Sequence, residues 1–313
     1  MFKKLSFVIP CYGSEQTITL VIDEIRQWVQ QHSVYTYEII AVNDCSPDKV
    51  YNVLVNLAKT IPELKLIELA MNCGKHAAVM AGYKYVTGDV VVNLDDDGQC
   101  PIDKLDLLLE ALAADNDVVL ARYPVKKQSS FKNFGSWINE LMARWLIKQP
   151  KGLQISNFSV MRRLIVNEIL RYKNPYPYLA GLFLRATSRI VNVEMEERER
   201  IAGSSGYNFR KSLSLWLNGF TAFSVKPLRL ATIIGFLTSF TGFLFAIYVV
   251  LRKVLYPEIA AGYSSLMAVQ LFTGGVIMVC LGLIGEYVGR IYISINNSPQ
   301  YVIRETVNID ESK

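Results

Sequence analysis

Two long segments without a charged residue most constrain the fold of this 313-residue chain. They cover residues 230–251 and 259–285, and each exceeds the roughly 20 apolar residues that a helix needs to cross a bilayer core. The sequence therefore predicts two transmembrane helices. Lys226 and Arg229 precede the first and Arg290 follows the second, which favours a hairpin with both ends in the cytoplasm.

The first 207 residues follow a different pattern, in which short apolar runs alternate with segments of helical periodicity. This alternation is typical of parallel βαβ units and predicts an α/β fold with a mostly parallel, doubly wound sheet. Strands are expected at residues 5–9, 37–42, 64–69, 90–94 and 118–121, and a further short strand at 300–307. The opening residues lead directly into the first strand, so the N-terminal region is expected to stay in the cytoplasm.

An acidic loop follows the uncharged strand at residues 90–94. Asp95, Asp97 and Gln99 present oxygen ligands at alternate positions, a spacing that suits Mg²⁺ or Mn²⁺. A solvated acidic turn is the simpler alternative. A calcium loop of the EF-hand type is excluded, because Cys100 and Pro101 stand where that loop needs its glycine.

The other predicted strands also end in polar residues. In open α/β sheets, ligands bind beyond the carboxyl ends of the strands, so these residues are expected to gather in one place. They are Tyr12, Glu15, Asp44, the segment 72–75, and Arg122. The net charge of +5 is modest and makes nucleic acid an unsuitable partner. Five cysteines without CxxC spacing argue against a disulfide framework.

Two segments carry apolar residues at helical spacing beside basic residues. The first, residues 131–149, contains Trp137 and Trp145, and the second, residues 208–228, directly precedes the first apolar segment. Both patterns are typical of helices lying at a membrane interface, with a core-facing helix as the alternative for the first.

With these loops placed, the sequence resembles the family 2 glycosyltransferases of GT-A fold. It is most similar to the polyprenyl-phosphate branch related to dolichol-phosphate mannose synthase and the bacterial bactoprenyl-phosphate glucosyltransferases. Residues 8–15 resemble the family pattern VIPxYNE, residues 42–48 the pattern VDDGSxD, and residues 95–101 the signature DxDxQxP. The two apolar segments are also like those of the bacterial branch.

The resemblance implies roles for the loop residues. Pro10, Tyr12, Glu15 and Asp44 would hold the nucleoside of a UDP-sugar, with turn chemistry and helix capping as alternatives for Tyr12 and Asp44. Lys75 would lie close to the diphosphate. The divalent cation, Mg²⁺ or Mn²⁺, would be bound by Asp97 and Gln99, with Asp95 contacting the nucleotide or the metal. Asp96 is expected to matter least of the three aspartates.

The resemblance also implies a phosphate-binding group. Arg122 matches the arginine at the end of a family strand, and residues 200–207 resemble the segment RxxGxSxY. Arg122, Arg200, Ser205 and Tyr207 would bind the lipid phosphate and the leaving diphosphate, with Asp95, Asp97, Arg122 and Arg200 as the catalytic set. Guanidinium groups suit this role because they bind phosphate oxygens in pairs. Arg198 stands in a charged run, residues 196–200, of the kind that usually forms a solvated surface.

Asn157 departs from the family. Related bacterial enzymes often carry an aspartate here that has been considered as a base, and an asparagine cannot accept a proton at neutral pH. A sugar hydroxyl normally needs such a base, whereas a phosphate monoester has a second pKa of about 6 and is already ionised. We therefore expect an acceptor that is a lipid phosphate.

The function implied is inverting transfer of a single hexose, glucose first, from a UDP-sugar to undecaprenyl phosphate at the bacterial inner membrane. The product would supply sugar for cell-surface glycans. Homo-oligomers are plausible by analogy. Two alternatives remain: a processive polysaccharide synthase, although its QxxRW motif is missing, and a non-catalytic protein that binds nucleotide-sugars. The expected domains are residues 1–207 (catalytic), 208–228 (juxtamembrane), 229–290 (membrane hairpin) and 291–313 (cytoplasmic tail).

Overall fold

The computed structural model describes residues 2–123, 144, 149–196, 198, 226–256, 262–296 and 298–309. The chain forms two compact units, one made of Met1–Gly219 with Asn297–Lys313 and the other of Phe220–Asn296. The amphipathic helix predicted at 131–149 lies outside the described residues, apart from residues 144 and 149. The one predicted at 208–228 lies outside them up to residue 225.

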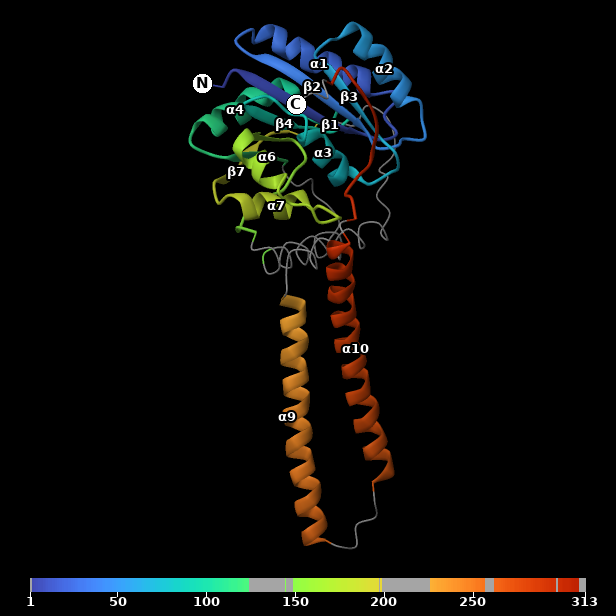
Figure 1. Cartoon of the computed structure of the whole chain (residues 1–313). Coiled ribbons are helices and arrows are strands. Elements are labelled where there is room, and N and C mark those ends of the chain that lie inside the picture. Colours follow the sequence, from blue (N-terminus) through green and yellow to red (C-terminus); the bar gives the residue numbers. More distant parts are fainter. Residues whose placement is uncertain are drawn as a thin grey trace. The chain divides into compact units, whose positions relative to one another are not determined.

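In the described part of the first unit, eight strands form one mixed sheet in the order β7-β5-β6-β4-β1-β2-β3-β8 (Figure 1). The strands that share one direction are β1 (Lys4–Cys11), β2 (Thr36–Asn43), β3 (Leu64–Leu69), β4 (Val90–Asn93), β5 (Val118–Arg122) and β7 (Ile190–Glu194). The two antiparallel strands are β6 (Ser159–Arg162) and β8 (Ile303–Val307). The predicted α/β fold with a mostly parallel sheet is confirmed.

Helices cover both faces of this sheet (Figure 1). One face carries α1 (Ile18–Gln31), α2 (Val50–Thr60), the short 3-10 helix η1 (Ile102–Lys104) and α4 (Leu105–Ala113). The opposite face carries α3 (Lys75–Tyr83) and α6 (Arg163–Ile169), and α7 (Leu179–Ala186) packs on α6. At Gly82 an added Cβ would lie 2.6 Å from Val8 Cγ1, so glycine allows α3 to pack directly against β1.

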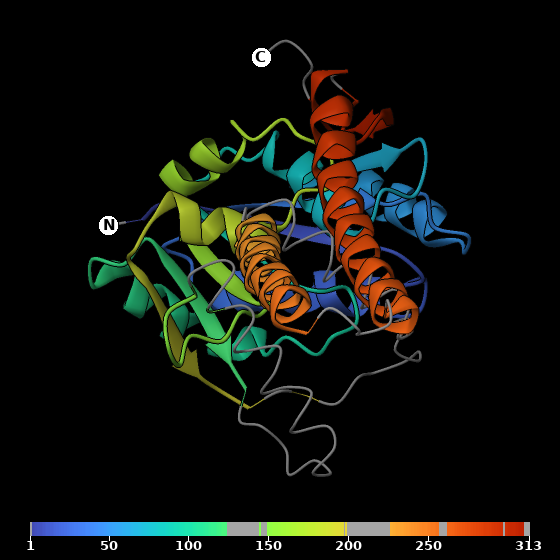
Figure 2. The ribbon, with the colours of Figure 1, turned by 90° about the horizontal axis from the view of Figure 1, so that it is seen from below.

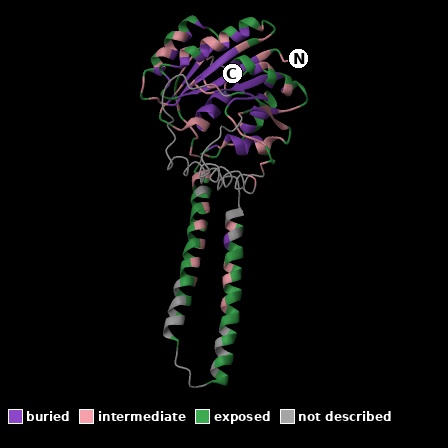
Figure 3. Ribbon diagram, turned by 180° about the vertical axis from the view of Figure 1, so that it is seen from behind, coloured by how far each residue is buried: buried purple, intermediate pink, exposed green. Residues whose placement is uncertain are grey.

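The central strands are buried on both faces, which explains why they read as continuous apolar runs (Figure 3). In β1, Leu5, Phe7 and Ile9 face the helices α1, α2 and α4, and Val8 faces α3. All four side chains are fully buried. This rigid sheet fixes the loops at its carboxyl edge.

The second unit contains two long helices, α9 (Lys226–Leu255) and α10 (Tyr263–Ile295), which lie side by side (Figures 1 and 2). Most of their described apolar side chains are exposed, as the colours of Figure 3 show. Among the described residues, Phe272–Ile295 alone is long and apolar enough to cross a membrane, and Ala231–Phe245 is a shorter apolar stretch. Thr232, Thr238 and Thr273 each donate a hydrogen bond to a carbonyl one turn earlier, so these hydroxyls need no water.

The chain returns to the sheet of the first unit after α10. Strand β8 pairs with β3 and confirms the short strand predicted at residues 300–307. Tyr51 in α2 donates a hydrogen bond to Glu305 (2.8 Å), and Asn308 donates to the carbonyl oxygens of Ala58 (2.8 Å) and Leu64 (2.9 Å). Residues beyond the predicted hairpin are therefore part of the first unit.

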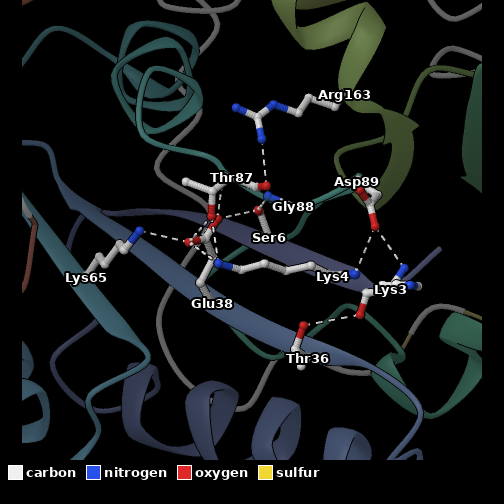
Figure 4. Close-up of polar contacts among 10 residues, drawn as sticks. All are labelled: Lys3, Lys4, Ser6, Thr36, Glu38, Lys65, Thr87, Gly88, Asp89 and Arg163. Atoms are coloured by element: carbon white, nitrogen blue, oxygen red, sulfur yellow. Dashed lines mark hydrogen bonds and ion pairs between the residues drawn. The ribbon is translucent and has the colours of Figure 1, made fainter. Parts of the chain in front are cut away.

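A buried carboxylate holds together the opposite, amino-terminal edge of the sheet (Figure 4). Glu38 accepts hydrogen bonds from Ser6 Oγ (2.6 Å), Lys65 Nζ (2.8 Å), and the backbone N–H (2.6 Å) and hydroxyl (2.8 Å) of Thr87. Burial raises the pKa of the Glu38 carboxyl, but these hydrogen bonds outweigh it and lower the pKa to about 2.

The neighbouring pair Gly88 and Asp89 belongs to the same edge (Figure 4). Gly88 donates its N–H to Ser6 Oγ, and an added Cβ there would lie 2.7 Å from the Lys4 carbonyl oxygen. Asp89 accepts the backbone N–H groups of Lys3 (2.8 Å) and Lys4 (3.1 Å). This Gly-Asp pair therefore serves to join the start of β4 to the start of β1.

Candidate active site

The candidate site is built from loops at the carboxyl edge of the sheet. Because β1, β2, β3, β4, β5 and β7 point the same way, the loops after them emerge at one edge. The antiparallel strand β6 starts at that edge, so the segment before it, which contains Asn157, arrives there too. The predicted convergence of these loops is therefore found in the structure.

Asp95 lies at the centre of these loops. Lys75, the first residue of α3, forms an ion pair with Asp95 Oδ1. Asn157 Nδ2 donates a hydrogen bond to Asp95 Oδ2 at 3.0 Å. Both carboxylate oxygens thus have a donor, and three chain segments that are 20 or more residues apart meet at one group.

Asp96 joins two loops, although the sequence pattern gave it the least importance. Its Oδ2 accepts the backbone N–H of Tyr12 at 2.9 Å, and its carbonyl oxygen accepts the Thr17 hydroxyl at 2.6 Å. Burial raises the pKa of the Asp96 carboxyl to about 6. Asp96 therefore fixes the loop after β1 to the acidic loop after β4.

Asp97 and Gln99 lie on a tight turn. Gly98 between them has φ +75°, a left-handed conformation that favours glycine, and Asp97 Oδ1 accepts the backbone N–H of Gln99 at 3.1 Å. Gln99 is also hydrogen-bonded to Arg198. This turn presents the two side chains predicted to bind a cation.

The described residues contain no group of three or more histidine, cysteine, aspartate or glutamate side chains that could hold a metal ion. Asp97 and Gln99 supply one carboxylate and one amide. That set fits Mg²⁺ or Mn²⁺, which are commonly bound by one or two carboxylates together with phosphate oxygens of a substrate. It does not fit zinc, whose sites need more nitrogen or sulfur ligands.

Asp44 is buried and structures the loop that precedes α3. Its two carboxylate oxygens accept the backbone N–H groups of Cys73 (2.7 Å) and Gly74 (2.8 Å). Burial raises the pKa of the Asp44 carboxyl, and these two hydrogen bonds partly offset that rise. These hydrogen bonds reach a loop about 30 residues further along the chain and are not local turn chemistry, and each oxygen keeps a lone pair that a ligand N–H could use.

The remaining predicted nucleoside residues lie around the end of β1. Pro10 is buried in β1, whereas the side chain of Tyr12 is 54% exposed at the site edge. Glu15 accepts the backbone N–H of Lys49 (3.2 Å), and its own N–H is bound by Asp48 (2.9 Å). These hydrogen bonds join the loops after β1 and β2, and Tyr12 presents an exposed aromatic ring beside them.

Arg122 ends β5 and forms an exposed ion pair with Glu194 of β7 (3.4 Å). Met195 continues this pairing by donating its N–H to the Arg122 carbonyl. Arg200, Ser205 and Tyr207, the other residues predicted to bind phosphate, lie outside the described residues. Sequence reasoning missed Glu24 and Asp103, which both bind Arg198.

Comparison with known proteins places this site in context. Residues 6–170 match the family described as glycosyl transferase family 2, and residues 226–291 match the GtrB C-terminal hairpin. The chain is 31% identical to the SfII prophage-derived bactoprenol glucosyl transferase of Shigella flexneri, over 97% of this chain and 98% of that protein. It is 32% identical to the undecaprenyl-phosphate 4-deoxy-4-formamido-L-arabinose transferase of Photorhabdus laumondii, over 97% and 94%.

The fold is also similar to a solved structure. Glucosyl-3-phosphoglycerate synthase from Mycobacterium tuberculosis, crystallised with Mn²⁺, UDP and phosphoglyceric acid, superposes with a TM-score of 0.50 at 17% identity. The likeness covers 69% of this chain and 75% of that one. At this identity the comparison concerns the fold alone.

Proposed function

We propose that this chain, which belongs to glycosyltransferase family 2, transfers one hexose from a UDP-sugar to undecaprenyl phosphate with inversion at the anomeric carbon. Two relatives matched over nearly their full length are named for bactoprenol or undecaprenyl-phosphate acceptors. Their sugars differ, one being glucose and the other an aminopentose, and glucose is our first choice for this chain. The observation that carries the proposal is the meeting of Lys75, Asp95 and Asn157 at the carboxyl edge.

The donor would bind across the loops after β1, β2 and β3. Tyr12 offers an exposed ring for the uracil base, and Asp44 offers acceptor lone pairs for its imide N–H, with Pro10 and Glu15 shaping the pocket. Lys75 and Asp95 would lie at the diphosphate, where the ammonium group offsets negative charge.

A divalent cation, Mg²⁺ or Mn²⁺, would be held by Asp97 and Gln99, with Asp95 nearby. When bound, it would supply positive charge to the leaving diphosphate. Lys75 and Asn157 each donate to one carboxylate oxygen of Asp95, and each oxygen keeps a lone pair, so Asp95 would contact the nucleotide or the metal.

The acceptor would be a phosphate, because the residue beside Asp95 is an amide. Asn157 donates a hydrogen bond to Asp95 and cannot take a proton from a sugar hydroxyl. A phosphate oxygen, already ionised, would form the bond to C1 as the bond from C1 to the β-phosphate oxygen breaks and UDP leaves. Arg122, together with Arg200, Ser205 and Tyr207, would bind the phosphates.

Purified full-length protein in detergent provides the test of this function. It would be offered several nucleotide-sugars, with undecaprenyl phosphate or a neutral polyprenol as acceptor, and Mg²⁺ or Mn²⁺. We expect a glycosyl-phospholipid by mass spectrometry from the phosphate acceptor only. Its rate should rise with pH through about 6, as the phosphate loses its second proton, and then stay level. Absence of product from every donor would contradict the proposed function, and transfer to polyprenol would contradict the role given to Asn157.

Helices α9 and α10 would anchor the enzyme as a two-span membrane hairpin, with domains at 1–207, 208–228, 229–290 and 291–313. The support is topological: β8, which follows α10, pairs with β3, which precedes α9. Both flanking segments must therefore lie on the same side of a membrane, so the chain crosses an even number of times. If α10 crosses, as its Phe272–Ile295 stretch indicates, a crossing by α9 would supply the second.

Reporter fusions in bacterial cells would test this topology. We expect an alkaline phosphatase fused after Glu258, between the helices, to be active, because that position would lie outside the cytoplasm. A green fluorescent protein fused to the C-terminus of the whole chain should fluoresce, since residues after α10 would lie inside. An inactive phosphatase fusion that is nevertheless expressed would show that α9 does not cross.

A further inference from the structure

Arg198 connects three separate segments of the first unit. Its Nη1 binds Glu24 Oε1 of α1 at 2.5 Å, and its Nη2 forms an ion pair with Asp103 in η1. A guanidinium can bind two carboxylates at once because its donors form a planar fork. Both arms bind carboxylates of the protein, although 38% of the Arg198 side chain is exposed, so the arginine joins these segments at the surface of the unit.

The backbone of Arg198 contacts the cation-binding turn. Its N–H donates to the carbonyl oxygen of Gln99 at 3.3 Å, and Gln99 Nε2 donates to the carbonyl oxygen of Arg198 at 3.4 Å. A side-chain amide has its NH₂ group and its oxygen on the same carbon, pointing in different directions. Holding the NH₂ group on Arg198 therefore selects which way Gln99 Oε1 points.

We propose that Arg198 is a positioning residue for the cation site: by binding Glu24 and Asp103 it holds its own carbonyl where that carbonyl orients the Gln99 amide. This proposal rests on the proposed function, in which Gln99 is a cation ligand. Partners of metal ligands typically change metal affinity by about 10- to 100-fold when they are removed, because they fix the direction of the ligand atom.

The charges around Arg198 support this role. Glu24 and Asp103 come from α1 and η1, two elements that also pack against each other in the core below. Asp103 follows Gln99 by four positions, so Arg198 contacts the loop of the proposed cation ligand at two points: its backbone binds Gln99 and its side chain binds Asp103. Two carboxylates at 27% and 51% side-chain exposure would repel each other without the arginine between them.

Metal binding by the full-length protein in detergent tests the proposal. Mn²⁺ affinity would be measured in the presence of UDP, by electron paramagnetic resonance of free Mn²⁺, beside the Mn²⁺ concentration that gives half-maximal transfer. Arg198→Ala is expected to weaken Mn²⁺ binding about tenfold or more. The variant Glu24→Gln/Asp103→Asn should also weaken Mn²⁺ binding, although it leaves the arginine in place. If Arg198→Ala does not fold, this second variant still tests the proposal.

The matched control is Arg189→Ala. Arg189 also binds a carboxylate through its guanidinium, with both oxygens of Asp115 at 2.9 Å, but at the amino-terminal side of β5 and β7. It should leave Mn²⁺ affinity unchanged. The proposal would be overturned if Arg198→Ala and Glu24→Gln/Asp103→Asn both kept the wild-type Mn²⁺ affinity. It would also be overturned if these variants raised only the KM for the lipid. A wild-type protein without transfer would instead contradict the proposed function.

Discussion

Replacing Asp97 by asparagine is expected to lower metal-dependent turnover at least about a hundredfold, because one of the two proposed cation ligands loses its charge. The substitution leaves the turn intact. Asp97 Oδ1 accepts the N–H of Gln99 at 3.1 Å, and an asparagine oxygen can accept the same hydrogen bond. The loss should therefore appear in kcat and in the Mn²⁺ titration, measured as UDP released, with little change in the urea midpoint of unfolding.

Asp115→Asn is the control for this substitution. Asp115 is an exposed carboxylate before β5, at the edge of the sheet opposite the site, so its neutralisation should leave turnover at the wild-type value. If Asp97→Asn keeps the wild-type dependence on Mn²⁺, Asp97 is not a ligand and the cation site has been placed on the wrong side chains.

Glu38→Gln is expected to lower the free energy of unfolding at pH 7 by about 2–4 kcal/mol. The estimate follows from the pKa of Glu38, which is about 2 in the folded chain against an ordinary 4.5, at about 1.4 kcal/mol for each pH unit. Glutamine would also place an NH₂ group against donors such as the Thr87 N–H and Lys65. Pulse proteolysis of the full chain in detergent across urea would measure the change.

The effect of Glu38 also has a predicted pH dependence. A carboxyl whose pKa is lowered by folding stabilises the protein above its unfolded pKa, and this contribution disappears as the pH falls through the folded pKa. The stability difference between wild type and Glu38→Gln should thus be full above pH 4.5 and shrink towards pH 2. Glu110→Gln, at an exposed position on α4, should show neither effect. A difference independent of pH would mean that packing, and not ionisation, gives Glu38 its role.

Much of the catalytic sheet could be predicted from the sequence, because buried parallel strands are uninterrupted apolar runs. Val90–Asn93 and Val118–Arg122 were found within a residue or so of their predicted ends. The antiparallel direction of β6 could not be predicted, since residues 123–158 separate it from β5 and periodicity carries no information about strand direction. The position of β8 likewise depends on pairing with a strand more than 230 residues earlier.

Site residues could be predicted where a motif directly follows a strand. Contacts between side chains far apart in the sequence were harder to predict. The approach of Lys75 and Asp95 follows from their positions after parallel strands, whereas the approach of Asn157 depends on the direction of β6. The roles of Asp96 and Arg198 do not, because Asp96 binds a backbone N–H 84 residues away and Arg198 binds Glu24 across 174 residues. A charged run and an aspartate triplet look solvated in sequence, and only the fold shows which members bind distant parts of the chain.

The pairing of β8 with β3 also sets the order in which this protein can be completed during synthesis. The edge of β3 stays open until residues 303–307 emerge, after both long helices have been made. An open strand edge invites pairing with other chains, and domains of a growing chain fold from the N-terminus onward. Insertion of the two helices into a membrane, as proposed, would therefore take place while the sheet is unfinished. A chain that ends before β8 would leave the edge of β3 unpaired and open to pairing with other chains. Pairing of β8 with β3 would therefore complete the sheet.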